Sequence, residues 1–358
     1  MHQKELRYAN QNLSRHKLAN NGGFLVSESI DVHTHLVPAE FPAYLGKCAN
    51  LPWPSMKHDG CGCAQIIIQG KNYRTVNDTH WDGAKRIADM DRMCVRRQVV
   101  SPMPELLSYW LPPKDAAVLL RHINGEIAGL CSAQPERFSG LGGVPLQDVD
   151  LAIRELEFLL REQKLAGVEI ATNVNGVSIG NPRFEPFFAA AEELSLPIFV
   201  HGLHPAGTDR LVGPAFLEQL VGFPGDLAYG IASLITGGMI ERHPRLRIAF
   251  AHGGGAFAMV LPRLEHGWNT FPALKALLPQ APSAYARKFY YDTLVYNPQV
   301  LELIIKSFGA EQIMLGTDHP FGMTDPDPHA AIRTLGLGPD AEKLLCGGNA
   351  RRFLGMPA

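Results

Sequence analysis

The sequence has no long apolar run and almost no excess of charge. No apolar stretch approaches the roughly 20 residues of a membrane-spanning helix, so we expect no membrane span. The 33 basic and 35 acidic side chains give a formal net charge of -2, which provides no electrostatic basis for binding nucleic acid. Residues 1–27 contain no apolar core of a secretory signal. We therefore expect a cytoplasmic protein with neither nucleic acid nor a membrane as its partner.

Cysteine is also scarce, and its spacing carries no known motif. The six cysteines include no CxxC pair, so neither a disulfide framework nor a cysteine zinc site is predicted. The one close pair, "CGC" at 61–63, is most simply two strand or turn thiols in a reducing compartment. No GxGxxG follows a first strand, which argues against a doubly wound, dinucleotide-binding sheet.

Short β-rich apolar runs alternate with amphipathic stretches after residue 28, without a break in composition. Residues 150–163 carry a leucine stripe, and residues 181–194 begin with an Asn cap and a Pro, so both predict helices. This alternation predicts an α/β fold, a (β/α)8 TIM-type barrel spanning 28–358 after an N-terminal extension, 1–27. The eight runs are "SIDVHTHL", "RRQVVSPM", "FSGLGGVPL", "GVEIATNV", "LPIFVHGL", "LRIAFAHGG", "KFYYDTL" and "QIMLGTDHP".

One segment interrupts the alternation. Residues 46–80 are rich in Gly, Pro and Asn around two strand-like pieces, "AQIIIQG" and "NYRTVN". We expect a small β insertion after the first barrel strand. Loops at the carboxyl ends of barrel strands surround the active site, so the insertion should reach over that site.

Polar residues end several of the apolar runs. In "IDVHTH" the two-residue period of a strand points His33 and His35 to the same side. His201 ends the fifth run, His252 the sixth and Asp318 the eighth. Such groups are costly in a barrel unless they have partners. Because all five lie at the same end of the predicted barrel, they indicate a metal site.

The residue types narrow the metal and its chemistry. Three imidazoles and one carboxylate suit Zn²⁺, which we expect, and also admit Mn²⁺, Co²⁺ or Fe²⁺. A free position on the ion lowers the pKa of bound water toward about 7. The run "GVEIATNV" has no Lys that could bridge two ions, and its Glu169 sits early in the run. We therefore expect one divalent ion and no organic cofactor.

The chain resembles the amidohydrolase superfamily, and within it the 2-amino-3-carboxymuconate-6-semialdehyde decarboxylase family. The resemblance extends from residue 28 to residue 355. It rests on motifs that include "IDVHTH", "NYRTV", "HWD", "SYW", "RFSGLGGVPLQ", "AHGGGAF", "PRLEHG", "FYYDTLV", "LGTDHPF" and "GNARRFLG".

The resemblance assigns roles to individual positions. It implies that the metal ligands are His33, His35, His201 and Asp318. It makes His252 the acid/base of the catalytic centre, where it would act beside Asp318. Arg74 would bind a substrate carboxylate from the insertion. Arg263 would come from the neighbouring subunit, which implies a homodimer.

The function implied is a metal-dependent decarboxylase of a small carboxylated muconate semialdehyde or aromatic acid. Hydroxide addition followed by loss of CO2, and direct protonation of a metal-held substrate, both remain open. The alternative is a hydrolase or hydratase of the same superfamily, acting on a lactone or an unsaturated dicarboxylic acid. A metal-binding scaffold without catalysis would leave His252 without a role.

Two loops depart from the family pattern. After His201 the chain reads "GLHPAG" in place of a Pro-Trp-Asp run, and after Asp318 it reads "HPF" in place of Tyr-Pro-Phe. His204 and His319 are therefore candidates for new substrate contacts.

Overall fold

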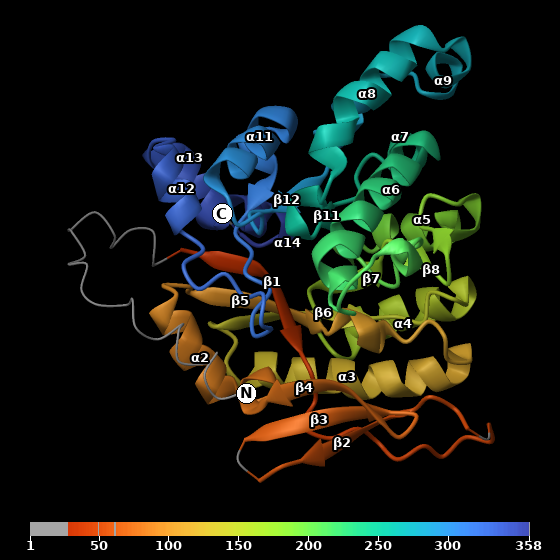
Figure 1. The fold of residues 1–358 in the computed structure, drawn as a ribbon, viewed down its shortest axis with the longest axis vertical. Helices are drawn as coiled ribbons and strands as arrows, with labels where there is room; N and C mark the ends of the chain where they lie inside the picture. Colours follow the sequence, from red (N-terminus) through yellow and green to blue (C-terminus); the bar gives the residue numbers. More distant parts are fainter. Residues whose placement is uncertain (1–27, 49, 61, 358) are drawn as a thin grey trace.

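The computed structural model is a parallel barrel that encloses the candidate site at one end (Figure 1). It describes residues 28–48, 50–60 and 62–357; the predicted extension and Cys61 lie outside these ranges. Eight strands pair in parallel in the order in which they occur along the chain. They are β1 (Ile30–Leu36), β5 (Arg97–Pro102), β6 (Phe138–Gly143), β7 (Gly167–Ala171), β10 (Ile198–His201), β11 (Ile248–Phe250), β12 (Tyr290–Asp292) and β13 (Ile313–Met314).

The last strand region returns to the first. Val32 N–H donates to Leu315 O at 2.9 Å, and Asp318 N–H donates to His33 O at 2.8 Å. The predicted (β/α)8 TIM-type fold is therefore confirmed, and each of the eight predicted runs contains one barrel strand. All seven residues of β1 are buried, as is usual for a parallel strand covered on both faces.

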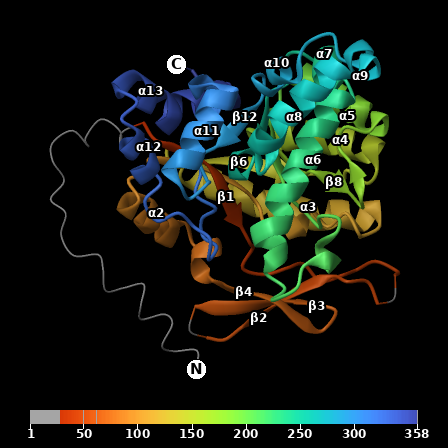
Figure 2. The same ribbon diagram turned by 45° about the horizontal axis from the view of Figure 1, so that its top comes forward.

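Helices cover the outside of the barrel (Figures 1 and 2). The helix expected at 150–163 is α4, which begins after Asp148, whose carboxylate accepts from Leu151 N–H. The helix expected at 181–194 begins with a 3₁₀ turn and continues as α5. The longer helices are α2 (Gly83–Arg92), α3 (Pro113–Ala133), α4 (Val149–Arg161), α5 (Glu185–Glu193), α6 (Phe223–Thr236), α8 (Phe257–Thr270) and α11 (Pro298–Phe308).

The insertion after β1 forms a separate antiparallel sheet. It consists of β2 (Pro54–His58), β3 (Cys63–Ile68) and β4 (Lys71–Asn77). The sequence pattern predicted β3 and β4 but missed β2, because "PSMKH" contains few β-forming side chains. Figure 2 shows this sheet against one end of the barrel.

An arm projects from the opposite end of the molecule. Helix α8 continues into α9 (Pro272–Leu277), and both stand away from the barrel in Figure 1. Among the described residues, no helix combines the length and the apolar character needed to cross a membrane.

Candidate metal centre and active site

Three imidazoles and one carboxylate converge at the carboxyl ends of the strands. His33 and His35 come from β1, His201 ends β10, and Asp318 follows β13. One ligand atom from each lies within 4.8 Å of all the others. His33 Nε2 is 3.1 Å from His35 Nε2, which in turn is 3.3 Å from Asp318 Oδ1. All four residues are buried, so their polar atoms require partners.

The other ring nitrogens are already occupied, which tests whether the four residues fit a metal ion. His33 Nδ1 pairs with Asp292 Oδ2 at 2.7 Å, His35 Nδ1 with Pro102 O at 3.0 Å, and His201 Nδ1 with Gly202 O at 2.8 Å. When Nδ1–H donates a hydrogen bond outward, Nε2 is unprotonated and its lone pair faces inward. The residues therefore fit a divalent ion, and the four could hold one.

The electrostatics of His201 and Asp318 also suit a metal. At His35, burial acts to lower the pKa, but the hydrogen bond with Asp318 and nearby carboxylates outweigh it and raise the pKa. Burial lowers the pKa of His201 well below 6.5, and its imidazole neighbours add to the shift. Burial acts to raise the pKa of Asp318, but the hydrogen bond with His35 and the nearby imidazoles outweigh it and bring the value to about 2. A neutral imidazole and an ionised carboxylate are the forms that bind metals.

Glu169 on β7 is the other carboxylate that the sequence placed near this centre. It is fully buried and is not one of the four converging groups. Burial raises its pKa to about 7, which disfavours the ionised form that a ligand needs. Glu169 therefore does not join the four candidate ligands.

Asp292, at the end of β12, contacts this site and was not among the residues singled out from the sequence. Besides its bond with His33, it accepts from the backbone N–H groups of His252, Gly253 and Leu294 at 2.8–3.0 Å. It therefore joins one metal-ligand candidate to the loop of His252. The signal was present in "FYYDTL", where a carboxylate ends an apolar run just as Asp318 does.

His252 lies beside the four converging groups, and its backbone has a positive φ. It follows β11 in a short 3₁₀ turn with a φ of 51°, and Asp318 has a φ of 63°. Non-glycine residues at positive φ are strained and concentrate at functional sites. His252 Nε2 lies 3.2 Å from His201 Nε2. Burial lowers the pKa of His252 to about 4, and His33 adds to the shift, so its imidazole is neutral near pH 7.

Glycines after His252 allow the loop to pack tightly, as expected from "HGGGAF". Gly255 has φ 59° and ψ -129°, a region open essentially to glycine alone. A Cβ there would lie 2.1 Å from the carbonyl oxygen of Pro224. These glycines serve close packing between the His252 loop and the start of α6.

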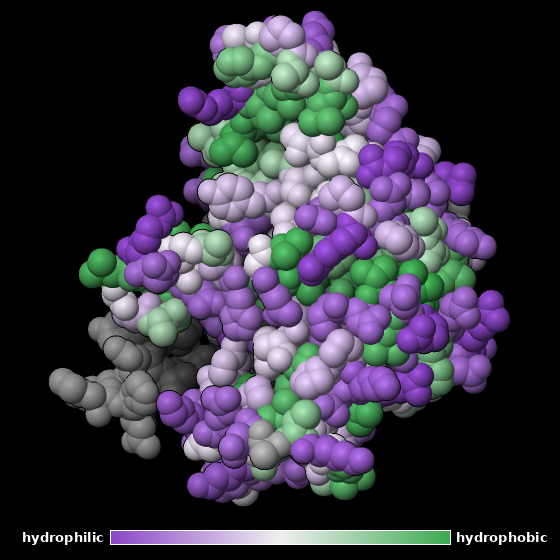
Figure 3. Space-filling view, turned by 90° about the vertical axis from the view of Figure 1, so that its right-hand side faces the viewer, coloured by the Kyte–Doolittle hydropathy of each residue, from purple (hydrophilic) through white to green (hydrophobic). Residues whose placement is uncertain are grey.

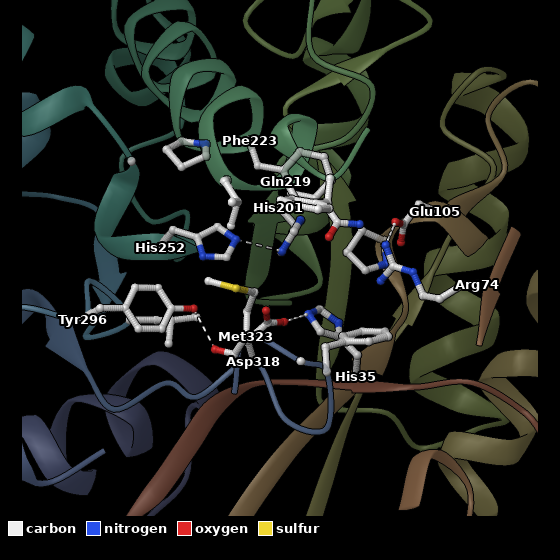
Figure 4. Close-up of a pocket in the computed structure, with 18 of the residues that line it drawn as sticks. His35, Arg74, Glu105, His201, Gln219, Phe223, His252, Tyr296, Asp318 and Met323 are labelled. Carbon is white, nitrogen blue, oxygen red and sulfur yellow. Dashed lines mark hydrogen bonds and ion pairs between the residues drawn. The ribbon is translucent and has the colours of Figure 1, made fainter. Parts of the chain in front are cut away.

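A cavity of about 700 Å³ opens over these groups, a size suited to a small organic molecule. Figure 4 shows His252 and Tyr296 on one side and Arg74 and Glu105 on the other. Arg74 reaches the cavity from β4 of the insertion, and Arg74 Nη2 donates to Glu105 Oε1 at 2.6 Å. The apolar lining includes Phe216, Leu220, Phe223, Leu294, Val295, Phe321 and Met323.

The remaining predicted site residues lie outside this cavity. His204 lines a separate cavity of about 170 Å³ and packs against Trp110, with ring centroids 5.2 Å apart. His319 is buried and bonds to Asp89 Oδ2 at 3.1 Å through Nε2, because the backbone turn after Asp318 directs it toward α2. The structure therefore brings neither histidine to the cavity wall.

Arg263 also lies away from the cavity of its own chain. It is exposed on α8, on the projecting arm, and has no hydrogen bond or ion pair within the part of the chain that the structure describes. A contact with a substrate would require the cavity of a second copy.

Known proteins resemble this chain over nearly its whole length. The amidohydrolase family profile matches residues 30–356. The 2-amino-3-carboxymuconate-6-semialdehyde decarboxylase of Dictyostelium discoideum is 37% identical, with 92% of each chain covered.

Solved structures resemble the fold. The 5-carboxyvanillate decarboxylase of Sphingomonas paucimobilis is 27% identical over 76% of this chain and 83% of its own, with a TM-score of 0.70. A dihydroxybenzoic acid decarboxylase of Polaromonas sp. JS666, solved with bound manganese, has a TM-score of 0.68 at 22% identity, covering 76% of this chain and 85% of its own. With its converging histidines and aspartate at the barrel mouth, this chain belongs to the amidohydrolase family, in the branch that contains the 2-amino-3-carboxymuconate-6-semialdehyde decarboxylases.

Proposed function

We propose that this protein is a metal-dependent decarboxylase without an organic cofactor, acting on a small carboxylated muconate semialdehyde or aromatic acid. The observation that carries the proposal is the convergence of His33, His35, His201 and Asp318 beneath a cavity that also contains His252. The relatives named above, which are decarboxylases, favour this chemistry over hydrolysis or hydration.

One divalent ion would be held by those four residues. When bound, such an ion acts as a Lewis acid that draws electron density from a substrate oxygen, and it also provides a position at which water or substrate binds. The ligand set suits Zn²⁺, and the manganese in the Polaromonas enzyme makes Mn²⁺ the first competitor.

His252 would manage the proton of the reaction. Loss of CO2 leaves a carbon that must receive a proton, and a neutral imidazole at the cavity wall can take a proton from one group and return it to another. The backbone bond of His252 N–H to Asp292 holds its loop in place. Asp318 and His201 would keep the reacting end of the substrate at this wall.

Arg74 would orient the substrate from the opposite wall. Its guanidinium carries five N–H donors, and the pair with Glu105 involves Nη2, so other donors remain for a substrate oxygen. A substrate held between Arg74 and the histidines is fixed relative to His252, which lowers the entropic part of the barrier.

We also propose a homodimer in which Arg263 reaches the neighbouring active site. The arm that carries Arg263 exposes apolar side chains, which Figure 3 shows as a hydrophobic region on α8 and α9. Burial of such a patch by a second copy removes it from water. The exposed apolar residues of the arm are Met259, Val260, Phe271 and Leu277.

The proposal is tested by giving the metal-loaded protein 2-amino-3-carboxymuconate-6-semialdehyde and a panel of carboxylated phenols, with CO2 release and product mass measured together. We expect the product of at least one compound to have lost CO2. A product that has gained water would establish the hydrolase or hydratase alternative, and no reaction of any compound would contradict the proposed function.

A further inference from the structure

The one permanently positive side chain among the described residues that line the cavity is already paired. Arg74 is that side chain, and its Nη2 lies 2.6 Å from Glu105 Oε1. Glu105 lines the same cavity, so a molecule bound there would meet the Glu105 side chain as well as Arg74. Within one chain, the end of the cavity formed by these two residues therefore carries no net charge before any substrate enters.

Glu105 belongs to the wall and cannot easily move aside. It lies in a 3₁₀ turn, Pro104–Leu107, whose four residues are all buried directly after β5. The guanidinium of Arg74 is also held over the ring of Phe321, 4.8 Å from its centroid. Burial raises the pKa of Tyr73, and the nearby Glu105 carboxylate adds to that shift. Separation of this pair would leave a buried charge without its partner, which is costly.

A second substrate carboxylate at this end would meet both members of the pair. It would gain the remaining N–H donors of Arg74 but would also approach the fixed negative charge of Glu105. A neutral acceptor such as a hydroxyl, ether or carbonyl oxygen gains the same hydrogen bonds without the repulsion. The apolar side chains that line the rest of the cavity suit an aromatic ring better than a charged chain.

We infer that Glu105 sets the substrate class, so that the enzyme takes aromatic acids with a single carboxylate and with an uncharged oxygen facing Arg74. This inference rests on the proposed function and refines it, because it favours the aromatic acid over the muconate semialdehyde with several carboxylates. It also revises the prediction that Arg74 binds a carboxylate. In this inference Arg74 donates hydrogen bonds to an uncharged substrate oxygen, because Glu105 balances its positive charge.

The test compares two ligands of the same shape and different charge. Two salicylates are titrated calorimetrically into the Mn²⁺-loaded protein. One has a carboxamide at position 5, and the other has a carboxylate there. We expect the carboxamide to bind about tenfold more tightly, as removal of one like-charge contact in a partly desolvated site would produce. Glu105→Gln keeps the shape and the hydrogen bond to Arg74 but removes the charge, and it should abolish or reverse the preference.

Two further variants serve as a control and as an independent test. Glu218→Gln removes an acidic group near the cavity that does not line it, and it should leave the ratio of affinities unchanged. Arg74→Gln leaves Glu105 uncompensated and should increase the preference for the carboxamide, so the inference stays testable even if Glu105→Gln folds poorly.

The outcomes separate this inference from the proposed function. An unchanged ratio in Glu105→Gln, or failure of both ligands to bind, would overturn the role of Glu105. A ratio that shifts as expected, in a protein that releases CO2 from no compound, would overturn the decarboxylase and leave the charge selectivity standing.

Discussion

The two walls of the cavity are built in different ways. The histidine wall (His35, His201, His252 and Asp318) comes from the ends of barrel strands, and two of its imidazoles bond directly to backbone carbonyls. The arginine wall (Arg74, Glu105 and Phe321) comes from the insertion, a 3₁₀ turn and a loop. A rigid strand end suits atoms that react, whereas loops and insertions suit selectivity, because they can change without disturbing the barrel.

His252→Ala tests the histidine wall with the largest expected effect. Removal of the group that handles the proton should lower kcat by about 100- to 10,000-fold. Metal content should stay at the wild-type level, because His252 is not one of the four converging groups. CO2 release and metal analysis of the same preparation measure both quantities. Full activity in the variant would remove His252 from the mechanism.

Asp292→Asn tests whether the histidine wall depends on the residues behind it. The change weakens the acceptor of His33 Nδ1 and of three backbone N–H groups. Loss of such support typically costs about 10- to 100-fold in metal affinity or activity. Competition with a chelator measures the affinity, and Asp150→Asn on the exposed surface of α4 serves as control. Equal affinities in the two variants would contradict the supporting role.

Gly255→Ala tests the packing that places His252. The residue would be forced into a glycine-only backbone region and against Pro224 O, so we expect a loss of about 1–3 kcal/mol in the free energy of unfolding. Gly129→Ala, in the interior of α3 with open space around it, should instead stabilise the protein by up to about 1 kcal/mol. Urea denaturation distinguishes them, and a shift of the same sign in both would refute this account.

Arg263→Ala tests whether a second copy contributes a residue to the cavity. We expect KM to rise about tenfold, because the variant loses one charge-assisted hydrogen bond worth about 1.4 kcal/mol. Mixing this variant with His252→Ala should restore activity, because the mixed dimer contains one site with both residues intact. Absence of any restoration, with dimers confirmed by mass, would exclude a shared site.

The predicted and missed features divide along the same lines as the two walls. The eight barrel strands and the four converging groups were recognisable because buried strands require continuous apolar runs, in which a terminal His or Asp stands out. Asp292 was present in the same pattern but was passed over. Glu105 offered no such signal, because it lies in a turn and its partner Arg74 is 31 residues away along the chain.

His204 and His319 show why sequence position alone was insufficient. Both follow strand ends, as the site residues do, yet one packs on Trp110 and the other bonds to Asp89. A strand directs its side chains with a fixed alternation, but after its last residue each turn sets its own direction.

By itself the sequence determined the barrel, the insertion after its first strand and the residues that converge at its mouth, since periodicity and strand ends are local properties of the chain. Only the tertiary structure decided that Asp292 supports His33 and His252, that Arg74 faces the cavity already neutralised by Glu105, and that Arg263 stands on a separate arm. Those relations depend on contacts between segments distant in the chain, which no local pattern encodes.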